Sequence, residues 1–70
     1  MSGLKKRSVN LAGHATSVAL EPEFWATLEA LAASRSLTLA GLLADIDQGR
    51  GERPLASACR VAALAFANQT

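Results

Sequence analysis

Residues 7–20 read RSVNLAGHATSVAL, and this stretch decides the kind of fold that follows. Side chains alternate between the two faces of an extended strand, so Val9 and Leu11 share one face of its first half. Val18 and Leu20 share one face of its second half in the same way. A turn around the glycine between the two halves would bring the apolar faces together. The stretch therefore predicts a short β-ribbon, folded as an antiparallel hairpin.

The expected register closes this hairpin with a turn over residues 12–15. Such a turn places Val9 opposite Val18 and Leu11 opposite Thr16, so that the two apolar faces coincide. An offset of one residue would place valines opposite serines and split the apolar face. An alternative arrangement leaves the first run as a loosely ordered arm, with only the second run as a strand.

Three helices are expected after the ribbon. Pro22 is tolerated in the first turn of a helix, and the flanking carboxylates of Glu21 and Glu23 complement the helix dipole there. Thr38 is well placed to cap a second helix. Pro54 opens a third segment that is apolar around most of its circumference. The expected helices cover residues 22–34, 38–48 and 55–67, after a flexible basic arm over residues 1–6 and the ribbon over residues 7–20.

The composition predicts one small domain with a thin core. The chain has 70 residues, of which 50% are hydrophobic, but it contains only two Phe and one Trp. A chain of this length buries only about 60% of its unfolded surface, and the apolar third helix needs cover on more than one side. We therefore expect a single, mainly α domain over residues 1–70, with a short β-ribbon, as an obligate homodimer. The expected dimer core contains Val9, Leu11, Val18, Leu20, Leu42, Ile46, Val61 and Phe66.

Charge and cysteine content narrow the class of protein. The formal net charge of +1 argues against a polycation that coats nucleic acid without specificity, although Lys5, Lys6 and Arg7 form a local basic patch. The single cysteine cannot form an intrachain disulfide, and no secretory signal is recognised, so the expected compartment is the cytoplasm. The apolar run Leu55–Ala67 falls short of the roughly 20 residues that span a bilayer, so no membrane association is expected.

No constellation of catalytic or metal-binding residues is recognisable. Cys59 has no base partner and lies on an apolar helix face, where a small core residue is expected. His14 has no second His or Cys at the spacing of metal ligands. The sequence contains no phosphate-binding loop and no converging pair of acidic residues. We therefore expect neither an enzyme nor a metal or cofactor site.

Two residues of the helices have expected structural roles. Trp25 lies at the edge of the apolar stripe of the first helix, so we expect its ring in the core and its indole N–H turned toward an acceptor at the rim. Arg60 interrupts the apolar third helix. We expect its guanidinium to pair with Asp45 or Asp47 across the dimer.

Three motifs lie at Gly13-His14-Ala15-Thr16-Ser17, Leu20-Glu21-Pro22-Glu23-Phe24-Trp25 and Ser57-Ala58-Cys59-Arg60. In this combination they resemble the patterns GHxTS, LExxFW and S-x-x-R of a bacterial ribbon-helix-helix subfamily. The succession of a strand, a proline and two amphipathic helices over Arg7–Asp47 is similar to the Arc and MetJ class of DNA-binding dimers. The resemblance predicts a ribbon-helix-helix fold, here with an additional C-terminal helix.

The resemblance also implies a function. Proteins of this fold are dimers whose paired strands enter the major groove of DNA and present outward side chains to base edges, so the expected function is that of a small transcriptional regulator. The N-terminus of the second helix usually holds a phosphate. Here that role falls to the Thr38 hydroxyl with the amides of Leu39 and Ala40. Lys5 and Arg7 are further candidates for phosphate contacts.

Base contacts are expected mainly from the first strand. Lys6, Ser8 and Asn10 share its polar face, where lysine can bond guanine and asparagine can pair with adenine. The second strand offers only small or acidic side chains outward. The remaining candidates for contacts from the ribbon are His14 and Ser17.

The width of the ribbon leaves alternatives open. Strands lie about 4.8 Å apart, so four paired strands from two chains would be about 14 Å across before side chains, whereas the major groove is about 12 Å wide. Either the first run leaves the sheet, or the hairpin of one chain is itself the ribbon, or the protein does not read the groove. In the last case the alternative function is a protein-interaction module, such as an antitoxin-like subunit or an adaptor.

Overall fold

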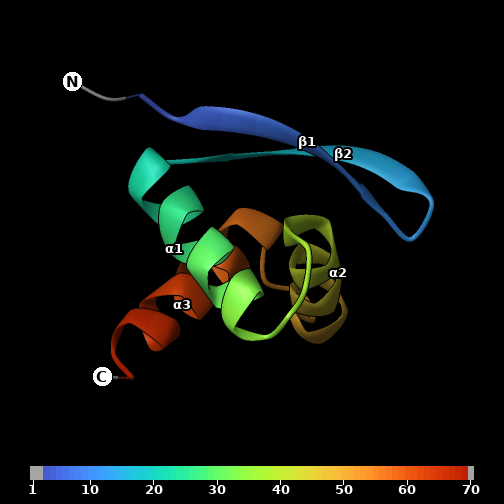
Figure 1. Cartoon of the computed structure of the whole chain (residues 1–70). Coiled ribbons are helices and arrows are strands. Elements are labelled where there is room, and N and C mark those ends of the chain that lie inside the picture. Colours follow the sequence, from blue (N-terminus) through green and yellow to red (C-terminus); the bar gives the residue numbers. More distant parts are fainter. Residues whose placement is uncertain (1–2, 70) are drawn as a thin grey trace.

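A computed structural model describes residues 3–69 as two strands followed by three helices (Figure 1). The expected mainly α fold with a short β-ribbon and an additional C-terminal helix is confirmed. The ranges of the first and third helices coincide with the expected ones, and the second helix lies one residue later. The strands are β1 (Lys5–Leu11) and β2 (His14–Leu20), and the helices are α1 (Pro22–Ser34), α2 (Leu39–Gly49) and α3 (Leu55–Ala67).

The first strand begins earlier than expected. Residues 1 and 2 of the expected flexible arm lie outside the described residues, but Lys5 and Lys6 belong to β1. They pair with Leu20 and Ala19 of β2, which holds them in the extended conformation. The expected arm is therefore too long by these two residues. A loosely ordered first run is excluded as well, since every residue of β1 has a partner in β2.

A two-residue turn at Ala12 and Gly13 joins the strands. Both residues have positive φ, 52° and 83°, as is required by the tight turn whose twist matches that of a β-hairpin. Val9 therefore lies opposite Thr16 instead of Val18, and the expected register is wrong by two residues. The apolar faces still coincide, because a shift by two residues returns every side chain to the same face of the sheet.

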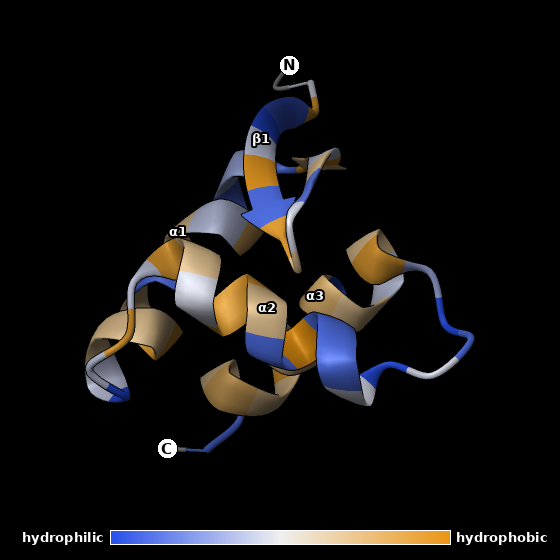
Figure 2. Ribbon diagram, turned by 90° about the vertical axis from the view of Figure 1, so that its right-hand side faces the viewer, coloured by the Kyte–Doolittle hydropathy of each residue, from blue (hydrophilic) through white to orange (hydrophobic). Residues whose placement is uncertain are grey.

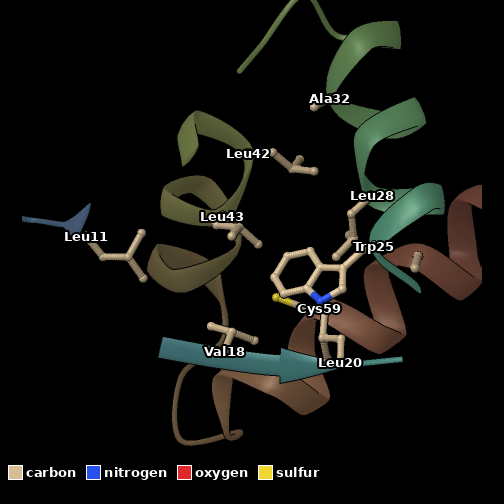
Figure 3. Close-up of a cluster of buried hydrophobic side chains, with 10 residues drawn as sticks. Leu11, Val18, Leu20, Trp25, Leu28, Ala32, Leu42, Leu43 and Cys59 are labelled. Carbon is tan, nitrogen blue, oxygen red and sulfur yellow. The ribbon is translucent and has the colours of Figure 1, made fainter. Parts of the chain in front are cut away.

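The hairpin covers one side of the three helices and closes the hydrophobic core (Figures 1 and 3). Hydrophilic and hydrophobic residues alternate along β1, as Figure 2 shows, so that only one face of the hairpin is apolar. All five elements contribute buried side chains to the core. The largest of those that are fully buried are Leu20, Trp25, Leu28, Leu42, Leu43 and Cys59.

The side chains expected in a dimer core divide into two groups. Four are buried within the single chain and have no surface left for a second copy: Leu11, Val18, Leu20 and Leu42. The other four are half-buried or exposed: Val9, Ile46, Val61 and Phe66. The single chain thus covers most of its own core. The homodimer stays a prediction, and only the second group retains surface with which to form it.

Helix α3 carries the single cysteine into the core. Cys59 is fully buried, and burial raises the pKa of its thiol to about 11. The thiol therefore stays protonated at neutral pH and packs as a small core side chain. Within residues 3–69, no helix is both long enough and apolar enough to cross a membrane.

Replacement of Gly13 by alanine should destabilise the hairpin. A Cβ atom would have free space at this position, but positive φ is strained for an L-residue with a side chain. We expect Gly13→Ala to lower the free energy of unfolding by about 1 kcal/mol in urea denaturation. Gly49→Ala is the matched control, because Gly49 also has free space but lacks the positive φ. An equal loss of stability in both variants would contradict the role of the turn.

The buried thiol predicts a loss of stability at alkaline pH. Its pKa of about 11 in the folded chain lies above the ordinary value of 9.0, so folding favours the neutral form. This contribution is complete below pH 9.0 and is lost as the pH rises through about 11. Over that range the free energy of unfolding should fall by about 2 kcal/mol more in the wild type than in Cys59→Ala. Urea denaturation at each pH measures this, and parallel pH profiles would refute it.

Candidate nucleic-acid interface

The hairpin presents one polar face to solvent, which we call the outer face. It consists of alternate residues of both strands: Lys6, Ser8 and Asn10 of β1 and, directly opposite them, Ala19, Ser17 and Ala15 of β2. All are exposed except Ala19, which is half-buried. The three residues expected to contact bases therefore share one face, and Ser17 joins them there.

The outer face is flat on the side of β2. Lys6 lies opposite Ala19 and Asn10 lies opposite Ala15, so each longer side chain has only a methyl group across the ribbon. Among residues 3–69, no intrachain hydrogen bond or ion pair engages the side chains of the outer face. Their donors and acceptors are thus available to a ligand.

Trp25 anchors β1 to α1. Its indole N–H donates to the carbonyl oxygen of Lys5 at 2.7 Å, which confirms the expected acceptor at the rim of the core. The Arg7 guanidinium lies over the indole ring, 4.9 Å from its centroid, and donates to the Glu29 carboxylate at 2.8 Å. These contacts hold the start of β1 on the helix. They also fix the direction in which Lys6 leaves the sheet, because neighbouring residues of a strand point to opposite faces.

Three residues of the ribbon that were expected to contact DNA do not belong to the outer face. Lys5 pairs with Leu20 and therefore alternates to the other side of the sheet, although its side chain is exposed. Arg7 lies on the inner face, where Glu29 already engages its guanidinium. His14 begins β2 on the same inner face. It lines a hollow of about 260 Å³ together with Asp47 and Arg50, close to the hairpin turn. All three side chains are therefore left out of the candidate base-reading surface.

The N-terminus of α2 offers backbone donors. The Thr38 hydroxyl caps this helix as expected, because it accepts a hydrogen bond from the Gly41 amide at 3.0 Å. Among residues 3–69, no acceptor engages the amides of Leu39 and Ala40. These two amides remain available to an anion. They lie on a different element from the outer face, and their contact with a phosphate stays a prediction.

The ion pairs leave the two lysines of β1 without acidic partners. In the part of the chain that the structure describes, every ion pair is made by an arginine: Arg7–Glu29, Arg35–Asp45, Arg50–Asp47 and Arg60–Glu21. Neither Lys5 nor Lys6 takes part in one. Two uncompensated positive charges therefore lie at the start of β1, where they favour the approach of a polyanion.

Arg60 connects two motifs that are far apart in the sequence. It was expected to pair with Asp45 or Asp47 across a dimer, and this expectation is wrong. Its guanidinium donates to the Glu21 carboxylate of the same chain at 3.1 Å and lies 5.7 Å from the centroid of the Phe24 ring. Both aspartates are already paired with other arginines. The only hint in the sequence was a lone arginine in an apolar helix and a carboxylate at a helix start.

This contact also compensates the acidic group of Glu21, which directly follows β2. The pKa of the Glu21 carboxyl lies below its ordinary value, chiefly because its own backbone amide hydrogen-bonds to it. Partial desolvation opposes this effect, and the Arg60 guanidinium lowers the pKa further. The carboxylate is therefore ionised at neutral pH, and Arg60 offsets the repulsion that it would exert on a phosphate.

The pairing of the strands removes one of the three arrangements that the ribbon width had left open. The first run does not leave the sheet, since β1 pairs with β2 along its whole length. A single hairpin is two strands wide and fits a groove of about 12 Å, whereas two hairpins joined edge to edge do not. If the protein reads the groove, it does so with the hairpin of one chain.

The comparisons with known proteins give one match. Residues 4–67 match a family model described as a ribbon-helix-helix domain, which covers both strands and all three helices. A search of curated proteins found no match. A search of solved structures found none either.

Removal of the Trp25 indole N–H should weaken the attachment of β1 to α1 and leave an aromatic ring in the core. Trp25→Phe keeps an aromatic ring but loses the donor to Lys5, so we expect a loss of about 1 kcal/mol in the free energy of unfolding. Amide hydrogen exchange should become faster in β1 than in α2. Glu29→Gln is the control, because the exposed ion pair that it removes contributes less than about 1 kcal/mol. Unchanged exchange in β1 of Trp25→Phe would show that the anchor lies elsewhere.

Proposed function

The chain belongs to the ribbon-helix-helix domain family, whose members are typically DNA-binding regulators or antitoxins, and we propose that it is a small transcriptional regulator that binds double-stranded DNA through the outer face of its own hairpin. The family has a regulatory fold without enzymatic activity. The regulator acts as a homodimer in the cytoplasm. Its ribbon differs from one assembled from two chains, because both strands come from one chain.

The observation that carries this proposal is the availability of the outer face. Its side chains form no intrachain hydrogen bond among the described residues, and they face away from the core. Polar groups in such a position contribute little to folding. They are, however, the groups that the major groove can recognise: the Asn10 amide matches the donor and acceptor of adenine, and the Lys6 ammonium matches the acceptors of guanine.

The two strands have different tasks in this proposal. Lys5 and Lys6 attract the phosphate backbone and release its counterions. The longer side chains of β1 then read base edges, while Ala15 and Ala19 allow close approach on the side of β2 and can contact thymine methyl groups. Ser8 and Ser17 donate to or accept from either base. The anchor at Trp25 orders β1 before binding, which reduces the entropy lost in the complex.

Phosphates beside the groove are the proposed ligands of the N-terminus of α2. The amides of Leu39 and Ala40 point along the positive end of the helix dipole. Such contacts position the protein on the duplex and carry no sequence information. They therefore supplement base reading by the outer face and do not replace it.

Two substitutions on the outer face should separate affinity from specificity. Asn10→Ala should flatten the preference among sequences selected from a random duplex library, at about 1–3 kcal/mol for the base that it reads. Lys6→Ala should weaken binding to all duplexes and reduce the slope of log affinity against log salt by about one. Fluorescence anisotropy over a salt series measures the second effect. Neither variant should change the free energy of unfolding measurably.

Each substitution has a matched control. Asn68→Ala removes the same amide at the end of α3 and should leave the selected sequences unchanged. Lys6→Arg keeps the charge and should keep the salt slope. If the wild type fails to bind any duplex at low salt, the regulator is refuted, and the protein-interaction module becomes the better explanation of the unengaged polar side chains on the outer face.

A further inference from the structure

The outer face of the hairpin is asymmetric across its width. Lys6 of β1 lies directly opposite Ala19 of β2, and Asn10 lies directly opposite Ala15. Each of these two cross-strand pairs combines one long polar side chain with one methyl group. Both long side chains belong to β1, whereas β2 contributes the two methyl groups and the Ser17 hydroxyl. The two strands therefore present different chemistry to the same ligand.

Each base pair in the major groove is asymmetric in a similar way. The purine presents N7 and the group at its 6-position, whereas the pyrimidine presents one polar group and, in thymine only, a methyl group. Directly opposite side chains of an antiparallel ribbon have Cβ atoms about 5 Å apart. A ribbon that lies along the groove thus places the two members of a cross-strand pair side by side over one base pair. The long side chain then faces one base, and the methyl group faces its partner.

The pair Asn10–Ala15 fits an A·T pair in one orientation. The Asn10 amide can donate to N7 of adenine and accept from its 6-amino group, while the Ala15 methyl contacts the thymine methyl group. A guanine under Asn10 would set its O6 acceptor against the amide oxygen. A reversed pair would leave the adenine amino group against the Ala15 methyl without an acceptor. Ala15 is exposed, so its methyl group is available for this contact.

The pair Lys6–Ala19 fits a G·C pair. The Lys6 ammonium donates to O6 and N7 of guanine, and cytosine has no methyl group to meet Ala19. Ala19 is half-buried and projects less than Ala15, which agrees with the absence of a methyl contact there. Lys6 and Asn10 are about 14 Å apart along the strand, and successive bases are about 3.4 Å apart along the duplex axis. The guanine and the adenine are therefore separated by about three to four base steps.

We propose that the hairpin reads two purines on the same DNA strand, an adenine under Asn10 and a guanine about three to four base steps away under Lys6. Ala15 is a specificity-determining residue, because it contacts the thymine of the A·T pair that Asn10 reads. Ser8 and Ser17 lie opposite each other between the two reading pairs and tolerate any base. This inference rests on the proposed function and names the class of duplex that the outer face selects.

Selection from a random duplex library by the full chain tests the spacing. The selected sequences should contain an adenine and a guanine on one strand at the stated separation. Asn10→Ala should lose the preference for the adenine alone, which identifies the A·T pair under Asn10. Lys6→Ala should lose the preference for the guanine alone. Purines on opposite strands, or a different separation, would overturn the inference and leave the regulator intact.

Removal of a single methyl group tests the role of Ala15. Deoxyuridine in place of the thymine of that A·T pair should weaken wild-type binding about fourfold, the contribution of one buried methyl group. Ala15→Gly should bind the thymine and deoxyuridine duplexes equally well. Ala67→Gly, at the end of α3, is the matched control and should keep the fourfold difference. Ala15→Ser replaces the methyl group without adding a glycine to the strand, and it should also lose most of the difference.

The outcomes separate this inference from the proposed function. A wild type that selects a sequence but binds both duplexes equally would overturn the role of Ala15, and so would a fourfold difference that persists in Ala15→Gly and Ala15→Ser. A methyl effect at a base pair other than the one that Asn10→Ala identifies would show that the two residues do not read the same pair. Failure to select or bind any duplex at low salt would instead refute the regulator itself, and the inference with it.

Discussion

The two strands pair through a two-residue turn at Ala12 and Gly13, and this pairing determines how the helices and the polar surface are arranged. The turn sets one register, and the register assigns every side chain of the hairpin to one of two faces. One face supplies Leu11, Val18 and Leu20 to a core that the three helices complete. The other face is left without any structural task. Both strands of the ribbon therefore come from a single chain, whereas in the alternative arrangement each of two chains would contribute strands to it.

The sequence predicted the faces of this hairpin but not its register. The period of two gives the same faces for every shift by an even number of residues, so the apolar pattern could not distinguish Thr16 from Val18 as the partner of Val9. The turn itself gave a weak signal, because a two-residue turn of this kind favours Asn or Asp where the chain has Ala12. The starts of the helices were easier to predict from the sequence, because Pro22, Thr38 and Pro54 mark them.

The sequence predicted the position of a site residue where the alternation of strand side chains determines it. It did not predict the position where contacts with distant residues determine it. Lys6, Ser8 and Asn10 share the outer face, as expected. Arg7 could not be assigned from the sequence, because its engagement depends on Trp25 and Glu29, some twenty residues further along the chain. For the same reason the pairing of Arg60 within its own chain was missed. The expected dimer core included side chains that are buried within the single chain, because the sequence could not show how completely one chain covers its own hydrophobic side chains.

Amide and side-chain chemical shifts during a duplex titration would show whether the outer face of one hairpin is the surface that contacts DNA. We expect the shift changes to concentrate on Lys6, Ser8, Asn10 and Ser17, with smaller changes at Leu39 and Ala40. Residues of α3 should remain unaffected. Changes confined to α3, or an absence of changes at low salt, would show that the outer face does not contact DNA.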